Sequence, residues 1–170
     1  MRRAMAAGFV VLALGSCSNA GAEPSTAEMA CGSTIGVLES ARTDEGYQWI
    51  LDAIALPEPG IQHETGRTDP ETGLRFAKMG LLVKPGHAST ITVDPDQQAE
   101  IRLGWGNIGD AVGHPDRPVE RLVIPACGGD EDFLIYGGGV WISEPACVAL
   151  TVETSDQSEP VLFPIDTDCP

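Results

Sequence analysis

Short apolar runs separated by turn-forming residues recur along the chain from Tyr47 onward. In Ser89–Asp94, Ile91 and Val93 face one way while the threonines between them face the other, which is typical of a strand with one buried face. Strands are also expected in other runs that glycine, proline or acidic residues bound in the same way: Tyr47–Leu56, Leu74–Lys84, Ile101–Trp105, Val119–Cys127, Phe133–Ser143, Cys147–Thr154 and Pro160–Asp166.

This spacing of strands predicts an all-β fold. No long amphipathic helix is evident, and only Thr34–Gly46 could hold a short helical turn. We expect an immunoglobulin-like β-sandwich of about seven or eight strands, with a β-barrel as the alternative. The 20 glycines and 13 prolines among 170 residues agree with a chain of many turns. One domain, residues 31–170, is expected.

Three consecutive glycines, Gly137–Gly139, interrupt the apolar run from Phe133 to Ser143. A phosphate-binding loop would need a following Lys-Ser or Lys-Thr, and a dinucleotide site would need a helix, whereas Val140 to Ile142 continues as a strand. Glycine inside a strand permits a bulge, a sharp bend or the close approach of another backbone. We therefore predict that the strand bends here, crossing between sheets or making room for a large ring.

The N-terminal segment has the layout of a secretory signal peptide. Residues 1–16 begin with two arginines, continue with an apolar run from Ala4 to Leu14, and end in small residues. The apolar run has about 11 residues, fewer than the roughly 20 that a membrane-spanning helix needs.

The end of this segment, Leu14-Gly15-Ser16-Cys17, resembles the lipobox of bacterial lipoproteins. The resemblance implies cleavage before Cys17, whose sulfur would carry a diacylglyceryl group with fatty acyl chains such as palmitate. It places the protein on the extracytoplasmic face of the cell membrane, with the lipid on Cys17 as its membrane contact. Residues 17–30 would then be the lipidated cysteine and a flexible linker. An ordinary secretory peptide is the alternative.

The other four cysteines predict two disulfides, since an even number in an exported chain favours a disulfide framework. They are Cys31, Cys127, Cys147 and Cys169, too far apart in sequence for a compact zinc site. Three connectivities are possible. A hairpin centred on Gln157 would place Cys147 opposite Thr167, near Cys169, so we favour Cys147–Cys169 and, by remainder, Cys31–Cys127.

The charge excludes one class of partner. Removal of residues 1–16 takes away two of the ten basic residues and none of the 25 acidic ones, so the net charge falls from −15 to −17. Such an excess repels nucleic acid. It agrees with solubility outside the cell, or with attraction of cations or basic partners.

The sequence contains only weak signals for a catalytic or metal-binding site. The histidines His63, His87 and His114 all fall in expected loops, and no G-x-S-x-G elbow is present. Two acidic turns, Asp94 with Asp96 and Asp130-Glu131-Asp132, could offer oxygen ligands to calcium but lack the EF-hand spacing. We therefore predict no catalytic residue, bound metal or cofactor.

The three tryptophans, Trp49, Trp105 and Trp141, are expected in the core, with a sugar-binding face as the alternative. The half of the chain from Leu74 onward also resembles a loose group of uncharacterised secreted proteins and lipoproteins of actinobacteria. The resemblance rests on Tyr136–Trp141, Glu144-Pro145-Ala146-Cys147 and Asp168-Cys169-Pro170. It implies an immunoglobulin-like extracellular domain and no known activity.

The function expected from the sequence is a non-catalytic binding or envelope-associated module, not an enzyme. It would act on an unknown envelope protein or ligand. A cell-envelope hydrolase with a site built from loops, and a calcium-dependent surface domain, are the alternatives.

Overall fold

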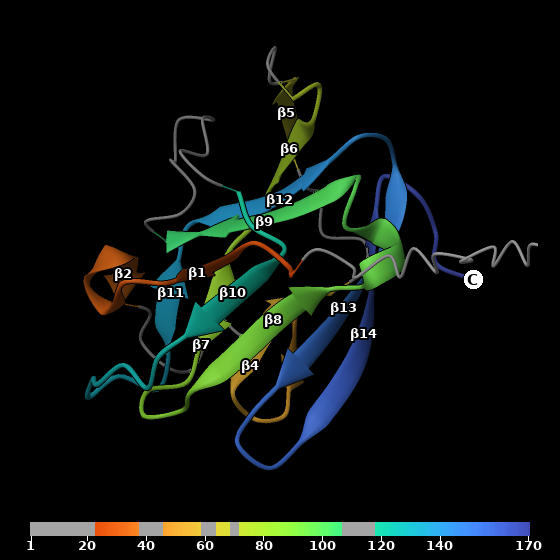
Figure 1. Ribbon diagram of the computed structural model, residues 1–170. Helices are drawn as coiled ribbons and strands as arrows, with labels where there is room; N and C mark the ends of the chain where they lie inside the picture. Colours follow the sequence, from red (N-terminus) through yellow and green to blue (C-terminus); the bar gives the residue numbers. More distant parts are fainter. Residues whose placement is uncertain (1–22, 38–45, 59–63, 69–71, 107–117) are drawn as a thin grey trace, which may run out of the picture.

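A computed structural model of the protein describes residues 23–37, 46–58, 64–68, 72–106 and 118–170 (Figure 1). These residues form strands and two short 3-10 helices, and they contain no α-helix. The elements are β1 (Thr26–Glu28), η1 (Cys31–Ser33), β2 (Thr34–Val37), β3 (Tyr47–Ile50), β4 (Ile54–Pro57), β5 (Glu64–Thr68), β6 (Arg75–Lys78), β7 (Leu81–Val83), β8 (Ser89–Val93), η2 (Pro95–Gln97), β9 (Ile101–Trp105), β10 (Arg121–Ile124), β11 (Leu134–Tyr136), β12 (Gly138–Ile142), β13 (Ala146–Glu153) and β14 (Ser158–Ile165).

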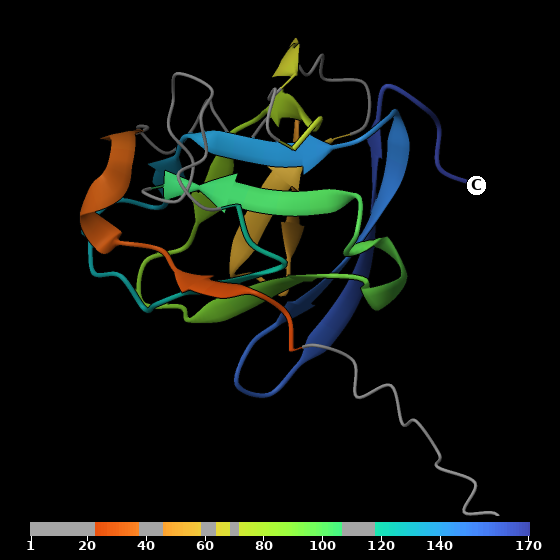
Figure 2. The same cartoon turned by 45° about the horizontal axis from the view of Figure 1, so that its top comes forward.

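The strands form three sheets. Sheet A has the order β1-β10-β8-β13-β14, sheet B the order β2-β11-β7-β4-β3, and sheet C the order β5-β6-β12-β9. Each pair of neighbouring strands among the described residues is antiparallel except β1 and β10, which run in parallel. Figures 1 and 2 show β9 and β12 side by side, running across β4 of sheet B.

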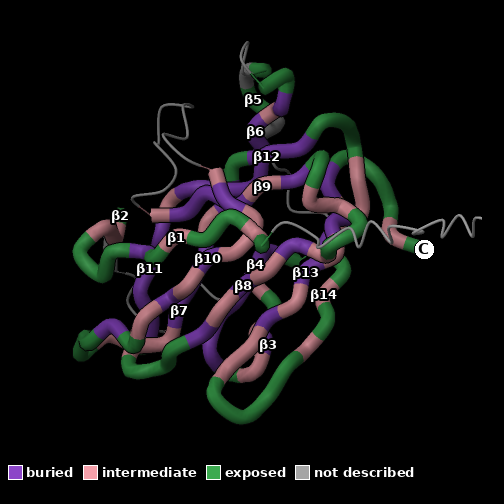
Figure 3. Tube along the Cα trace, viewed as in Figure 1, coloured by how far each residue is buried: buried purple, intermediate pink, exposed green. Residues whose placement is uncertain are grey.

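One hydrophobic core joins the three sheets. Ile91 and Leu150 come to it from sheet A, Ile54 from sheet B, and Leu103 and Val140 from sheet C. The purple stretches in Figure 3 mark the buried residues, which alternate with partly exposed ones along β8 and β13. The alternation predicted for Ser89–Asp94 is confirmed, and so is the all-β, sandwich-like fold. The immunoglobulin-like arrangement stays a prediction.

The strands are more numerous than expected because several predicted strands are divided in two. Leu74–Lys84 becomes β6 in sheet C and β7 in sheet B, and Phe133–Ser143 becomes β12 in sheet C and β11 in sheet B. Since β6 pairs with β12 and β7 with β11, the two segments bend together as one ribbon. The amide of Met79 donates to the carbonyl oxygen of Gly138 (2.8 Å) across the bend.

The glycine triplet lies at this bend. Gly137 separates β11 from β12, and Gly138 has φ +149°, a conformation that favours glycine. A Cβ on Gly138 would lie 2.2 Å from the carbonyl oxygen of Gly104, and one on Gly139 would lie 2.0 Å from that of Ala77. The predicted crossing between sheets and the close approach of a backbone are both confirmed.

The predicted strand Tyr47–Leu56 is divided for a different reason. Leu51 and Asp52 both have positive φ, 52° and 51°, and reverse the chain between β3 and β4. The Asp52 carboxylate accepts a hydrogen bond from the Lys84 ammonium (2.5 Å), which lowers the pKa of Asp52. Leu51 carries no turn signal in the sequence, so this turn was not expected.

The folded domain begins before residue 31, so the predicted linker is too long. β1 pairs with β10, Met29 is fully buried, and the backbone amide of Met29 donates to the carbonyl oxygen of Val123 (2.9 Å). An edge of sheet A is therefore completed by residues whose small, polar composition had indicated a flexible segment. Farther along, Thr34–Val37 forms β2, and residues 38–45, the rest of the segment that could have held a helical turn, lie outside the described residues.

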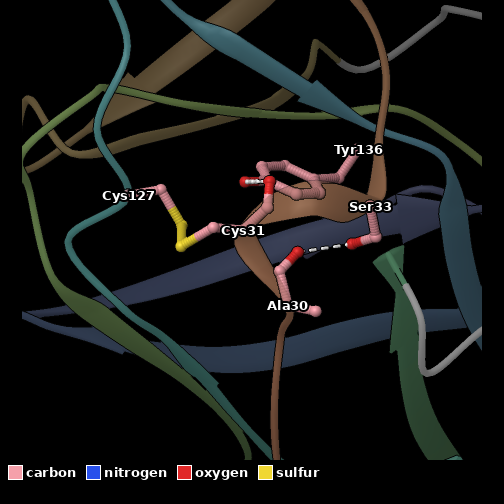
Figure 4. Close-up of a disulfide and its surroundings, with 5 residues drawn as sticks. All are labelled: Ala30, Cys31, Ser33, Cys127 and Tyr136. Carbon is pink, nitrogen blue, oxygen red and sulfur yellow. Dashed lines mark hydrogen bonds between the residues drawn. A yellow bond between two sulfur atoms is a disulfide. The ribbon is translucent and has the colours of Figure 1, made fainter.

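The Cys31–Cys127 disulfide follows β1 directly (Figure 4). Its Cα atoms are 5.4 Å apart, and the Tyr136 hydroxyl donates to the Cys31 carbonyl oxygen at 3.3 Å. Burial raises the pKa of this tyrosine above its ordinary value. The disulfide fastens the N-terminal strand of sheet A to the segment that leaves β10, which is the pairing predicted from the sequence.

The second predicted disulfide, Cys147–Cys169, is also present, but the hairpin register is not the expected one. Cys147 lies opposite Pro164 rather than Thr167, because the loop joins Glu153 to Ser158 and is not centred on Gln157. The chain turns after β14 and returns Cys169 to within 5.1 Å of Cys147, measured between Cα atoms.

β14 forms one edge of sheet A and is protected against pairing with another strand. The amide of Thr154 donates to the carbonyl oxygen of Gln157, so, by alternation, Pro160 and Pro164 occupy positions whose nitrogen faces away from β13. Proline has no N–H to offer there. The open edge therefore lacks two of the donors that a further strand would need.

Candidate functional site

Of the residues singled out in the sequence, Cys17, His63 and His114 lie outside the described residues. His87 lies exposed in the turn between β7 and β8. The two disulfides hold their cysteines on sheet A and its borders. The structure therefore does not bring the described candidates for catalysis together.

One of the two acidic turns caps a short helix, and the other lies at the surface. The Asp94 carboxylate accepts a hydrogen bond from the Asp96 amide at 2.9 Å and so caps η2. Asp130 and Asp132 are exposed beside the half-buried Glu131. Within the described part of the chain, no group of three or more histidine, cysteine, aspartate or glutamate side chains could hold a metal ion.

We accordingly expect calcium to leave the stability of the protein unchanged. A calcium site in either turn would bind the folded state preferentially and raise the melting temperature. Thermal unfolding followed by circular dichroism with and without 5 mM calcium should give midpoints within about 1 °C. A rise of several degrees that vanished in Asp130→Asn would establish the calcium-dependent alternative.

The tryptophans belong to packed regions. Trp105 is fully buried, and its Nε1–H donates to the carbonyl oxygen of Met79 at 3.1 Å. Trp141 is also buried, with its ring 4.9 Å from that of Phe76. Trp49 is partly buried against Phe133, at a ring distance of 6.1 Å. The core interpretation is confirmed for Trp105 and Trp141, whose rings offer no exposed face for a sugar.

A groove of about 410 Å³ lies on the outer face of sheet A, where β1 and β10 end, β8 begins and β13 ends. The strand register places Glu28 beside Val123, Val123 beside Thr90, and Thr90 beside Glu153. These four residues form one row across four adjacent strands, which Figure 1 shows side by side. The groove also includes Arg121 and the turn residues Thr154 and Ser155. Its volume is within the range of small binding sites.

The electrostatics of the groove rest on one cation and two carboxylates. Arg121 and Glu153 approach to 3.9 Å, with 42% and 44% of their side chains exposed. Glu28 is exposed at the opposite end of the row. Two other cations have closer partners: Lys84 pairs with Asp52 at 2.5 Å and Arg102 with Glu120 at 2.9 Å. Because its approach to Glu153 is longer than a hydrogen bond, the guanidinium of Arg121 keeps donors available to a ligand.

Sequence reasoning missed this groove because its residues come from separate segments, and only the strand register brings them together. The alternation of Thr90 with Ile91 correctly placed Thr90 on the outer face, but it could not show that Glu28 belongs to the same surface. That residue falls in the predicted linker, where no strand was expected.

No family model, curated protein or solved structure matches this chain. Among the described residues, no helix has the length and apolar character needed to cross a bilayer.

Proposed function

We propose that this protein is a lipid-anchored, extracytoplasmic binding module, attached to the cell membrane through Cys17. The observation that carries the proposal is the pairing of the cysteines. Four of the five are joined in two disulfides within the domain, so Cys17 alone remains. An unpaired cysteine in an exported protein needs a separate role, and lipidation within Leu14-Gly15-Ser16-Cys17 supplies one.

Two structural facts support this placement. Structural disulfides persist in oxidising compartments outside the cytosol. The folded domain begins near Ser25, whose hydroxyl donates to the Glu120 carboxylate at 3.0 Å. Only residues 18–24 would separate the lipidated cysteine from the domain. Such a segment of seven residues has a typical reach of about 15 Å, so the domain would lie against the membrane surface.

A binding role fits the groove better than catalysis does. The described residues that line it supply two carboxylates, a guanidinium and several hydroxyls, and no histidine, cysteine or lysine is among them. A hydroxyl nucleophile needs an adjacent base to activate it, and a carboxylate on an open surface is too weak a base for that purpose. The arrangement offers charge and hydrogen bonds to a ligand.

The anchor is tested by Cys17→Ala in cells fed an alkyne-bearing fatty acid. We expect the native chain to incorporate label and to enter the detergent phase of a Triton X-114 separation, because two or more acyl chains hold a protein firmly in a bilayer. Cys17→Ala should lose the label and move to the aqueous phase.

Ser18→Ala is the matched control, because it changes the neighbouring residue and leaves the cysteine in place. It should behave as the native chain does. Label that persisted in Cys17→Ala would contradict the proposed anchor. An unlabelled but secreted native chain would instead support the ordinary secretory peptide.

A further inference from the structure

The groove on sheet A has a defined length. Glu28 and Glu153 are the ends of a row that crosses β1, β10, β8 and β13. Adjacent strands lie about 4.8 Å apart, so three intervals separate the two glutamates by about 14 Å. This distance is too long for one ammonium group to contact both carboxylates. It equals about four residue steps of an extended polypeptide, at about 3.4 Å per step.

The floor between the two carboxylates suits a peptide backbone. Val123 supplies an apolar surface, and Thr90 supplies a methyl group and a hydroxyl. Arg121 borders this floor, and among the described residues its guanidinium pairs with Glu153 alone, at 3.9 Å. Half-exposed pairs of this kind contribute little to stability, so the guanidinium is free to donate hydrogen bonds to carbonyl oxygens.

We infer that the groove binds an extended, basic segment of a partner protein, with two lysine or arginine residues four positions apart. In an extended chain, residues i and i+4 project from the same face. One cation would contact Glu28 and the other Glu153, while carbonyl oxygens between them accept hydrogen bonds from Arg121. This inference rests on the proposed binding role and names the partner's chemistry.

The charge of the whole chain agrees with a cationic partner. A net charge of −15 for the full sequence attracts basic polypeptides and raises their association rate. The same charge disfavours polyanions. Arg121 distinguishes the groove from a general acidic surface, because a guanidinium near the carboxylates would repel a simple cation.

Two peptides of identical composition test the spacing. Acetyl-Lys-Ser-Val-Ser-Lys-amide has its lysines four apart, on one face, and acetyl-Lys-Ser-Val-Lys-Ser-amide has them three apart, on opposite faces. Isothermal titration of the full mature protein in detergent micelles, at 20 mM salt, should show the first peptide binding at least fivefold more tightly. Equal affinities would overturn the inference, because attraction by net charge alone does not depend on spacing.

Charge-removing variants test the residues. Glu28→Gln combined with Glu153→Gln should weaken binding of the first peptide about tenfold and abolish the preference between peptides. Glu144→Gln combined with Asp168→Asn removes the same charge from exposed positions outside the groove. This control should retain the preference, and its melting temperature and that of the groove variant should match the native value.

Arg121→Gln gives the sharpest result. If Arg121 merely repelled cations, its removal would strengthen binding of the basic peptide. Donation to peptide carbonyls predicts the opposite, a loss of about threefold to tenfold.

Titration with spermine is the last test. If spermine bound as tightly as the first peptide, with the same sensitivity to the glutamate variants, the groove would be a polyamine site and the inference of a peptide occupant would be overturned. These titrations report on the groove alone, whereas fatty-acid labelling reports on the anchor, so either can fail without the other.

Discussion

Replacing both Cys31 and Cys127 with alanine is expected to lower the free energy of unfolding by about 4–5 kcal/mol. The two residues are 96 positions apart, so their disulfide closes most of the domain into one loop and strongly restricts the unfolded chain. A loss of this size is comparable to the whole stability of many domains. Urea denaturation followed by tryptophan fluorescence measures it, and a variant that is unfolded without urea would agree.

The matched comparison is the double variant Cys147→Ala with Cys169→Ala, whose residues are 22 positions apart. The shorter loop predicts a smaller loss, by about 1 kcal/mol. If the short-loop variant were the less stable of the two, the stabilisation could not come chiefly from the unfolded state.

Gly139→Ala is expected to destabilise the domain by about 3 kcal/mol or more. The added Cβ would lie 2.0 Å from the carbonyl oxygen and 2.9 Å from the carbonyl carbon of Ala77, so the backbone of β6 or β12 would have to move. Overpacking of this kind, against backbone rather than a flexible side chain, belongs to the larger effects of single substitutions. Gly138→Val should be at least as damaging, because its φ of +149° adds strain.

Gly128→Ala is the control, since an added Cβ there meets no atom within 4 Å. Its unfolding midpoint should remain close to the native one. A native-like midpoint for Gly139→Ala would show that the ribbon of β6–β7 and β11–β12 tolerates separation at its bend. The crossing between sheets B and C would then be looser than the contacts indicate.

The sequence predicted the class of the fold because burial on one face leaves an alternating pattern, as in β8 and β13. It also predicted both disulfides: Cys147–Cys169 from the position of the hairpin, and Cys31–Cys127 as the remaining pair. The bend at Gly137–Gly139 was predicted, but the division of Tyr47–Leu56 was not, because Leu51 and Asp52 adopt left-handed conformations without a glycine or asparagine to indicate them. The hairpin register also differed, since a loop position can be read from composition only approximately.

The candidate site was out of reach of sequence reasoning for a related reason. Glu28, Arg121 and Glu153 are distant along the chain, and each by itself is an ordinary charged residue. The parallel pairing of β1 with β10 brings Glu28 to this surface, and the pairings of β10 with β8 and of β8 with β13 bring Glu153 to it. An edge strand of three residues is too short to show a clear alternation of apolar and polar positions. Whether these residues form a strand therefore depends on the partner strand rather than on their own composition.

The position of Cys31, three residues beyond the end of β1, determines how the domain responds to force. A pull on the chain from the N-terminal side of β1 is first resisted by the hydrogen bonds between β1 and β10. If these yield, the residues that precede Cys31 unravel first, and the disulfide then passes the load to the segment after β10. The six residues from Ser25 to Ala30 release about 20 Å of extended chain, while the core keeps its packing. The disulfide thus acts as a mechanical stop, at the cost of the edge strand that completes the groove.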